Sequence, residues 1–401
     1  MVGKTAFTAV NFIMPVLMIL GSVGFMFGTG GSALVSKTLG EGDNQKANRT
    51  FSLIVYSTIT AGLILAVIGF ALMRNIASAL GAEGKMLEDC VLYGRIIVTA
   101  LPFYMLQMEF QSLFITAEKP KLGLAVTVAS GVINMGLDAL FMWVFKWGIA
   151  GAAIATAFSQ AVGGCIPLVY FFRKNTSLLR LGKTRVNMRV IGKTCSNGSS
   201  EFVSQGSMSL VNMLYNAQLM NFVGDDGVAA YGVMMYVNMI FLAIFIGYSV
   251  GTAPVIGFNF GAQNTDELKS LRKKSFVIIG CSSAVMFAAS QVLAAPLSSI
   301  FVGYDKELFD LTVHGFRIFS FMFLFAGVSI FGSSMFTALN NGLISALISF
   351  LRTLVFQIAA VLLLPIFLKA DGIWASVVVA EIMSFVITIV FIIAKKRKYQ
   401  Y

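Results

Sequence analysis

Charged side chains are scarce in this 401-residue chain: Asp, Glu, Lys and Arg make up 12% of it, and hydrophobic residues make up 57%. Soluble globular domains carry about 25% charged residues, so this composition excludes a soluble enzyme or binding domain. The single histidine, His314, argues against histidine-based metal or triad chemistry. None of the four cysteines lies in a CxxC motif, so neither a disulfide framework nor a metal site is expected.

Apolar runs of membrane-spanning length fill the chain almost from end to end. A bilayer-crossing helix needs about 20 mostly apolar residues, so these runs predict an all-α polytopic membrane protein with about eleven transmembrane helices. The predicted spans are 4–39, 50–80, 87–116, 121–145, 149–173, 194–222, 226–260, 272–302, 308–338, 342–367 and 372–394.

Lysine and arginine are distributed unequally between alternate loops. Of the 29 basic residues, 20 fall in the loops at 37–49, 119–121, 173–193 and 269–274 and in the tail after 394. Basic residues are retained on the cytoplasmic side of a membrane, so we expect a cytoplasmic C-terminus and residue 1 on the outer side of the inner (cytoplasmic) cell membrane. This topology also accounts for the net charge of +11, and no nucleic-acid partner is expected.

The second half of the chain repeats the first at a shift of 221 residues. The segment GGSALVSKTLGEG from Gly30 aligns with GTAPVIGFNFGAQ from Gly251, and the same shift pairs Gly94 with Gly315. Recurrence at one shift predicts two homologous helical bundles arranged as parallel repeats.

The repeat divides the chain into an N-lobe at 1–173, a basic cytoplasmic linker at 174–193 and a C-lobe at 194–401. We expect the linker to be a solvated, positively charged loop. The helix predicted over 194–222 has no partner in the first half, so we expect a plan of six plus six helices with the first helix missing. A mis-assigned start codon or a degenerate gene would explain such a beginning.

Several segments resemble the multidrug and toxic compound extrusion (MATE) family, and within it the MepA-type bacterial branch. They are GTGGSALVSKTLGEG, the pair Asn134 and Asp138, GIAGAAIATAFSQ at 148–160, GTAPVIGFNFGAQ, the segment around Arg352, and GIWASVVVAE. The resemblance implies a monomeric secondary transporter without a cofactor. It also implies export of cationic, amphipathic drugs by alternating access, against H⁺ or Na⁺.

Asn134 and Asp138 are the first candidates for cation coupling. They lie one turn apart in the span 121–145 and therefore share a helix face. A carboxylate beside a carboxamide in a low-dielectric cavity can take up a proton or ligate Na⁺ through oxygen. The repeat does not duplicate the pair, so the fold alone does not require it. The alternative is a structural aspartate that neighbouring helices satisfy.

Glu381 is the second candidate for coupling, because it lies about 13 Å into its span, near the middle of the membrane. A buried ion pair with Arg352 is the alternative role. Arg95, Arg317 and Arg352 are interpreted as structural intramembrane charges. Glu109 is expected to be a solvated acid close to a helix end.

The polar side chains of the segment 208–220 are too numerous for a lipid-facing helix and predict a substrate-binding surface. The predicted substrate-binding residues are Gln160, Gln205, Asn212, Tyr215 and Asn216.

Three other functions remain open. A lipid-linked oligosaccharide flippase of the same superfamily would be expected to carry several Arg or Lys for pyrophosphate, and only three arginines are intramembrane here. A truncated, uncoupled relic is the second alternative. A polytopic membrane enzyme is the third, and HExxH, GxSxG and clustered acids are all absent from the sequence.

Overall fold

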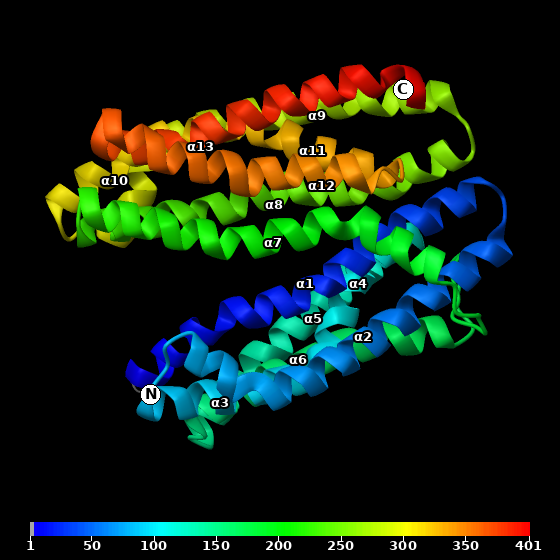
Figure 1. Cartoon of the computed structure of the whole chain (residues 1–401), viewed down its shortest axis with the longest axis horizontal. Coiled ribbons are helices and arrows are strands. Elements are labelled where there is room, and N and C mark those ends of the chain that lie inside the picture. Colours follow the sequence, from blue (N-terminus) through cyan, green and yellow to red (C-terminus); the bar gives the residue numbers. More distant parts are fainter. Residues whose placement is uncertain (1–3) are drawn as a thin grey trace. The chain divides into compact units, whose positions relative to one another are not determined.

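The computed structural model describes the backbone of residues 4–401 and the side chains from Thr8 onward. Its regular elements are all helices, with no β-strand among the described residues, which confirms the all-α prediction (Figure 1). The elements are α1 (Lys4–Gly40), α2 (Asn44–Ala79), α3 (Gly84–Thr99), α4 (Leu101–Thr116), α5 (Pro120–Ala139), η1 (Leu140–Val144), α6 (Gly148–Phe172), α7 (Met188–Phe222), α8 (Asp225–Gly261), α9 (Thr265–Val302), α10 (Lys306–Phe319), η2 (Ser320–Met322), α11 (Phe323–Ala338), α12 (Gly342–Phe350), η3 (Leu351–Val355) and α13 (Phe356–Tyr399).

Eight helical stretches are long and apolar enough to cross a membrane, or nine if the pair α3–α4, bent by 55°, is one span. The last stretch, Gly342–Tyr399, has 58 residues and breaks at Lys369, whose φ of 50° and ψ of −128° are not helical. If this stretch is divided at Lys369, and if the more polar α7 is counted as a span, each of the eleven predicted spans coincides with a helix or a bent helix pair.

The chain forms two compact units, Met1–Gln205 and Gly206–Tyr401. Helix boundaries recur between them at the shift seen in the sequence. α1 and α8 end 221 residues apart, at Gly40 and Gly261, and α2 and α9 begin at Asn44 and Thr265, also 221 apart. The repeat therefore extends from the sequence to the helix boundaries.

In the first unit, glycines allow α1 to lie close against α4. A Cβ atom built on Gly24 would lie 2.5 Å from the backbone oxygen of Met105, and one on Gly28 would lie 2.8 Å from the Cα of Glu109. Small residues four apart permit this close backbone approach, which is a common way for membrane helices to pack.

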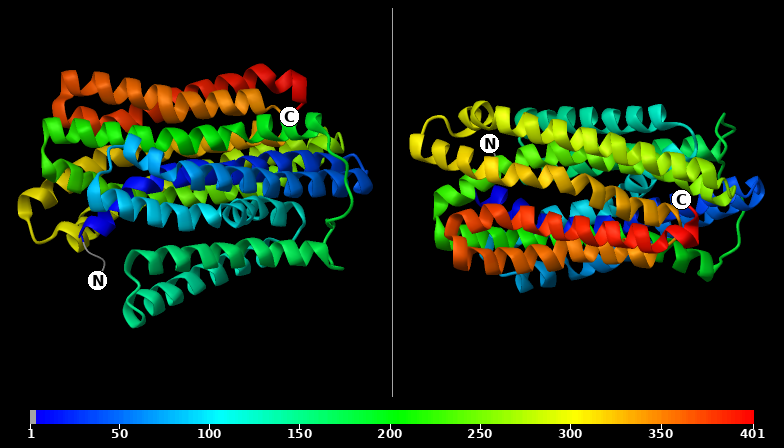
Figure 2. Two further views of the ribbon diagram at one scale, coloured as in Figure 1. Left: turned by 60° about the horizontal axis from the view of Figure 1, so that its bottom comes forward. Right: turned by 90° about the horizontal axis from the view of Figure 1, so that it is seen from above.

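α5 and α6 form an antiparallel pair in the first unit (Figure 2). The outer side of α5 exposes large apolar side chains, among them Leu124, Val128, Val132 and Met135. An exposed apolar face of this kind suits contact with lipid acyl chains. Ser130 is buried and Asn134 and Asp138 are partly buried, so these three polar side chains lie on its less exposed side.

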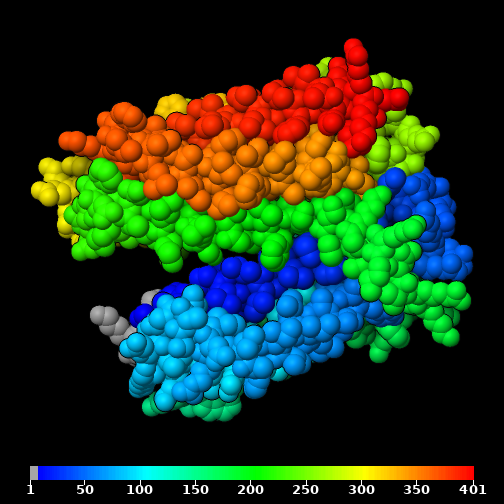
Figure 3. All heavy atoms as spheres, in the orientation of Figure 1, coloured from blue at the N-terminus to red at the C-terminus, as the bar shows by residue number. Residues whose placement is uncertain are grey.

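In the second unit, α10 packs closely against α8 and α13. A Cβ atom on Gly315 would lie 2.6 Å from Cε of Met234 and 3.0 Å from the ring of Trp374, which is itself buried. Figure 3 shows the side chains of α12 and α13 along one face of this unit.

The segment between α6 and α7 is anchored more firmly than the predicted solvated loop. Its basic side chains Arg180, Lys183 and Arg185 are exposed, as expected. However, Leu179 is 0% exposed, and the backbone N–H of Arg180 donates to Oδ1 of Asn48 over 2.6 Å. The expectation missed this contact because a buried leucine in a charged loop has no periodic signature.

Candidate functional site

A group of polar side chains from three helices surrounds the predicted coupling pair. Asn134 and Asp138 project from α5, Tyr93 from α3, and Thr156 and Gln160 from α6. Tyr93 is buried and lies close to both Asp138 and Thr156. These five residues are called the α5 polar cluster below.

Hydrogen bonds set the register of α5 against its neighbours. The Ser130 hydroxyl donates to the backbone oxygen of Ser159 over 2.7 Å and accepts from the Gln107 amide over 3.5 Å. Because α5 and α6 are antiparallel, a residue one turn after Ser130 on α5 lies level with a residue one turn before Ser159 on α6. Asn134 is thereby placed level with Thr156.

Three polar atoms of the α5 polar cluster are buried without a hydrogen-bond partner: Asn134 Nδ2, Asp138 Oδ1 and Gln160 Oε1. Rotation of the Asn134 amide exchanges its nitrogen and oxygen, so either atom can face the cluster. Buried polar groups in proteins are nearly always paired, and an exception calls for a functional explanation such as a bound ion. Neighbouring helices do not satisfy Asp138 Oδ1, which argues against the structural alternative.

Glu109 on α4 is not the solvated helix-end acid that was expected. Its side chain is 0% exposed, and both carboxyl oxygens are buried without a hydrogen-bond partner. Thr58 of α2 is its polar neighbour, although the two lie beyond strict hydrogen-bonding geometry. The expectation failed because α1 and α2 cover this end of α4, which the hydropathy pattern does not show.

Glu381 of α13 is 2% exposed and forms an ion pair with Arg352 of η3. Arg352 Nε lies 3.0 Å from both carboxylate oxygens, and Nη2 lies 3.0 Å from Oε1. This is the pairing named as the alternative to a coupling role. A two-point contact of this kind stabilises the charged forms of both groups.

The polar residues of α7 divide between a buried and an exposed side. Tyr215 donates to Oε1 of Gln357 over 2.8 Å, and Tyr231 donates to Oδ1 of Asn212 over 3.4 Å. The rings of Tyr215 and Tyr231 are stacked with centroids 5.4 Å apart.

Asn216 is exposed and Gln205 partly exposed, so they do not share the buried side of Tyr215. Gln160 lies on α6 in the first unit.

The remaining intramembrane arginines differ in their surroundings. In the first unit, Arg95 donates through Nε to the backbone oxygen of Phe70 over 3.3 Å and lies 4.8 Å above its ring. In the second unit, Arg317 is exposed, whereas Arg352 is paired with Glu381.

Tyr93 and Thr156 were missed by sequence reasoning. Hydroxyl residues are frequent in these apolar spans, so nothing in the pattern distinguishes Tyr93, which lies close to Asp138, or Thr156, which lies close to Tyr93. These two residues can be identified only from the way in which three helices pack around a single carboxyl group, and this packing is not visible in the sequence.

The MatE family model matches residues 1–140 and 202–363. The multidrug export protein MepA of Staphylococcus haemolyticus is 26% identical over 382 residues, covering 94% of this chain and 83% of that protein. MepA of Staphylococcus aureus is 23% identical over 375 residues, covering 93% and 82%. The chain belongs to the MatE family.

Solved structures share the fold. An outward-facing multidrug resistance MATE family transporter of the MOP superfamily superimposes with a TM-score of 0.93 at 18% identity, covering 100% of this chain and 90% of that one. A MOP superfamily transporter from Pyrococcus furiosus gives a TM-score of 0.91, also at 18% identity and with the same coverage.

The protein is therefore a multi-span membrane transporter and not an enzyme. Members of this family need no cofactor. Among the described residues, no three His, Cys, Asp or Glu side chains come together in a way that could hold a metal ion.

Proposed function

We propose that the protein exports cationic, amphipathic compounds from the cell and couples this export to the entry of H⁺ or Na⁺ at the α5 polar cluster. The observation that carries the proposal is the buried, unpartnered oxygen of Asp138, with a further unpartnered atom on Asn134 one turn earlier in α5 and another on Gln160 of α6. The names of the MepA relatives support drug export as the transport function.

Asp138 is the coupling residue in this proposal. Its carboxylate can bind one cation at a time, either a proton or a sodium ion. Sodium would find further oxygen ligands in Asn134, Gln160, Tyr93 and Thr156, because hard cations prefer carboxylate, carbonyl and hydroxyl oxygens. A cationic drug and a coupling cation would neutralise the same local charge, so occupancy by one disfavours the other.

The proposed substrate surface includes Asn212 and Tyr215 on α7. The rings of Tyr215 and Tyr231 are buried and stacked on each other, so a cation would bind over either face only after the surrounding helices move apart. Asn216, Gln205 and Gln160 stay in the proposal as polar contacts.

Glu381 stays a weaker candidate for coupling. Its ion pair with Arg352 would have to break before the carboxylate could bind a proton or Na⁺, and separating a buried pair is costly.

We further propose that the transporter works as a monomer in the inner (cytoplasmic) cell membrane, with the C-terminus in the cytoplasm. The exposed basic side chains of the segment between α6 and α7 support this orientation, because such loops are retained inside.

The experiment that tests coupling compares Asp138→Asn with wild type in proteoliposomes loaded with ethidium. A pH gradient and a Na⁺ gradient are imposed separately, and dye movement is followed by fluorescence. We expect wild type to respond to one of the two gradients and Asp138→Asn to respond to neither.

Asp310→Asn is the matched control, because Asp310 is an exposed acid of α10. It should transport like wild type. Gradient-driven transport by Asp138→Asn at the wild-type rate would disprove coupling at this residue, while the absence of dye transport in wild type would disprove the export function.

A further inference from the structure

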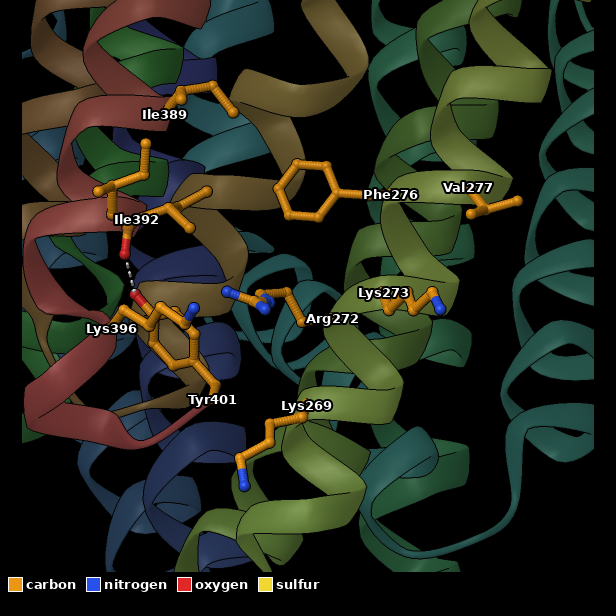
Figure 4. A pocket seen from close by; sticks show the side chains of 10 residues that line it. Lys269, Arg272, Lys273, Phe276, Val277, Ile389, Ile392, Lys396 and Tyr401 are labelled. Carbon is orange, nitrogen blue, oxygen red and sulfur yellow. Dashed lines mark hydrogen bonds between the residues drawn. The ribbon is translucent and has the colours of Figure 1, made fainter.

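A pocket of about 710 Å³ lies between α9 and the C-terminal part of α13 in the second unit (Figure 4). Four of its lining side chains are basic: Lys269, Arg272 and Lys273 from α9, and Lys396 from α13. None of the lining side chains is acidic. The pocket therefore has a strongly positive lining.

Three of these cations lack a local counterion. Lys269 pairs with Asp266 over 3.0 Å at the surface. In the described part of the chain no carboxylate forms an ion pair with Arg272, Lys273 or Lys396. Positive charges held close together without a counterion attract an anion, and this attraction is strongest where water is partly excluded.

The other wall of the pocket is apolar. Phe276 and Val277 continue α9 beyond the basic residues, and Ile389 and Ile393 continue α13. Val277 is 59% exposed and Ile393 is 67% exposed, so this wall is open to the surroundings of the helices. The pocket thus has a basic end and an adjoining apolar wall.

Tyr401 closes the floor of the pocket. It is buried, it donates to the backbone oxygen of Ile392 over 3.0 Å, and the Arg272 guanidinium lies 5.5 Å above its ring. Burial raises the pKa of the Tyr401 hydroxyl, and this effect outweighs the lowering by Arg272, so the hydroxyl stays a neutral donor at physiological pH. Arg272 is therefore held in place by a ring and not by a negative charge.

We propose that this pocket binds an anionic phospholipid, with the phosphate on Arg272, Lys273 and Lys396 and the acyl chain along Phe276, Ile389 and Ile393. Basic pockets between spanning helices on the cytoplasmic side suit anionic lipid headgroups. A free phosphate would use the basic end alone, whereas the adjoining apolar wall matches a lipid. This site is distinct from the transport function, although its cytoplasmic position follows from the proposed orientation.

The test uses the purified full-length chain in phosphatidylcholine nanodiscs that contain a trace of phosphatidylglycerol with a photoreactive acyl chain. Cross-linked peptides are identified by mass spectrometry, and unlabelled phosphatidylglycerol, phosphatidylcholine or inorganic phosphate is added as competitor. We expect labelling in residues 269–277 and 389–396, and we expect competition only from phosphatidylglycerol.

The test variant is Arg272→Gln with Lys396→Gln, and its control is Arg173→Gln with Lys174→Gln, which removes the same charge from exposed positions outside the pocket. Each Lys or Arg near an anionic headgroup contributes about 1 kcal/mol, so the test variant should bind the lipid more weakly, and half-displacement of its label should need roughly thirtyfold more competitor. The control should match wild type. Lys273→Gln with Lys396→Gln repeats the test while keeping the contact between Arg272 and Tyr401.

Three results would overturn the proposal. Equal labelling by a photoreactive phosphatidylcholine would mean that the pocket does not distinguish anionic from zwitterionic lipids. Displacement by inorganic phosphate at the same concentration would indicate a free-anion site. Unchanged labelling in both charge variants, with melting curves like that of wild type, would show that the basic residues do not hold the lipid.

Discussion

Glu109 shows, at the scale of a single residue, what a buried carboxyl without a partner does to stability. Its two oxygens are buried and make no hydrogen bond. Replacing an unsatisfied buried polar group by an apolar one of similar size removes a desolvation penalty of about 1–3 kcal/mol. Glu109→Leu should therefore raise the melting temperature of the detergent-solubilised protein.

Glu88→Leu is the control for this change, because Glu88 on α3 is exposed. It should leave the melting temperature nearly unaltered. A lower melting temperature for Glu109→Leu would mean that the carboxyl has a stabilising partner in the membrane.

Glu381 presents the opposite case, a buried carboxylate with a partner. Glu381→Gln leaves the partly buried Arg352 without a counterion, and breaking a buried pair in this way costs up to about 3–5 kcal/mol. The double variant Glu381→Gln with Arg352→Met removes both charges and should recover most of that loss. Thermal unfolding of wild type, of both single variants and of the double variant gives the coupling energy, and additive losses would show that the two residues do not act as a pair.

Sequence reasoning reached part of the α5 polar cluster at this scale. Asn134 and Asp138 could be selected because two oxygen-bearing side chains on one face of an apolar helix are rare and the repeat does not copy them. Tyr93 and Thr156 could not, since their importance depends on how α3 and α6 pack around α5. Glu109 was placed wrongly for the same reason.

At the scale of helices, the close crossing of α1 and α4 depends on glycine. A Cβ on Gly24 would lie 2.5 Å from the Met105 backbone oxygen, so a larger side chain must push the helices apart. Overpacking of this kind costs about 1–3 kcal/mol. Gly24→Val should lower the melting temperature measurably.

Gly131→Val on α5 is the comparison, because a Cβ there would have no neighbour within 4 Å. It should be tolerated. If both substitutions lower stability equally, the loss comes from the helix preference of valine and not from the crossing with α4.

The positions of the helices could be predicted from hydropathy, and so could the break at Lys369, which falls between the predicted spans 342–367 and 372–394. The bend between α3 and α4 was not predicted, because the apolar run 87–116 continues through it. Its local signal is Pro102 in the first turn of α4, since a proline is tolerated at the start of a helix but not in its interior.

At the scale of the whole molecule, duplication was the most informative signal in the sequence. Helix boundaries repeat at a shift of 221 residues, at the ends of α1 and α8 and at the starts of α2 and α9. A duplication constrains many positions at once, so it is visible even where individual matches are weak. The anchoring of the segment between α6 and α7 was not visible, because it depends on Leu179 and on a few hydrogen bonds to α2.

Orientation in the membrane gives the prediction for the whole chain. Single cysteines at Lys183, between α6 and α7, and at Lys306, at the start of α10, are introduced into a chain whose four native cysteines are replaced by serine. Both lysines are exposed. Since the basic loops are retained inside, a membrane-impermeant maleimide added to intact cells should label Lys306→Cys and leave Lys183→Cys unlabelled. After the cells are opened, the same reagent should label Lys183→Cys. This labelling is the control that shows that the cysteine at position 183 is reactive. The reverse pattern would mean that the C-terminus and the basic lipid pocket both face outward, because Lys183 and the tail belong to the same set of basic loops.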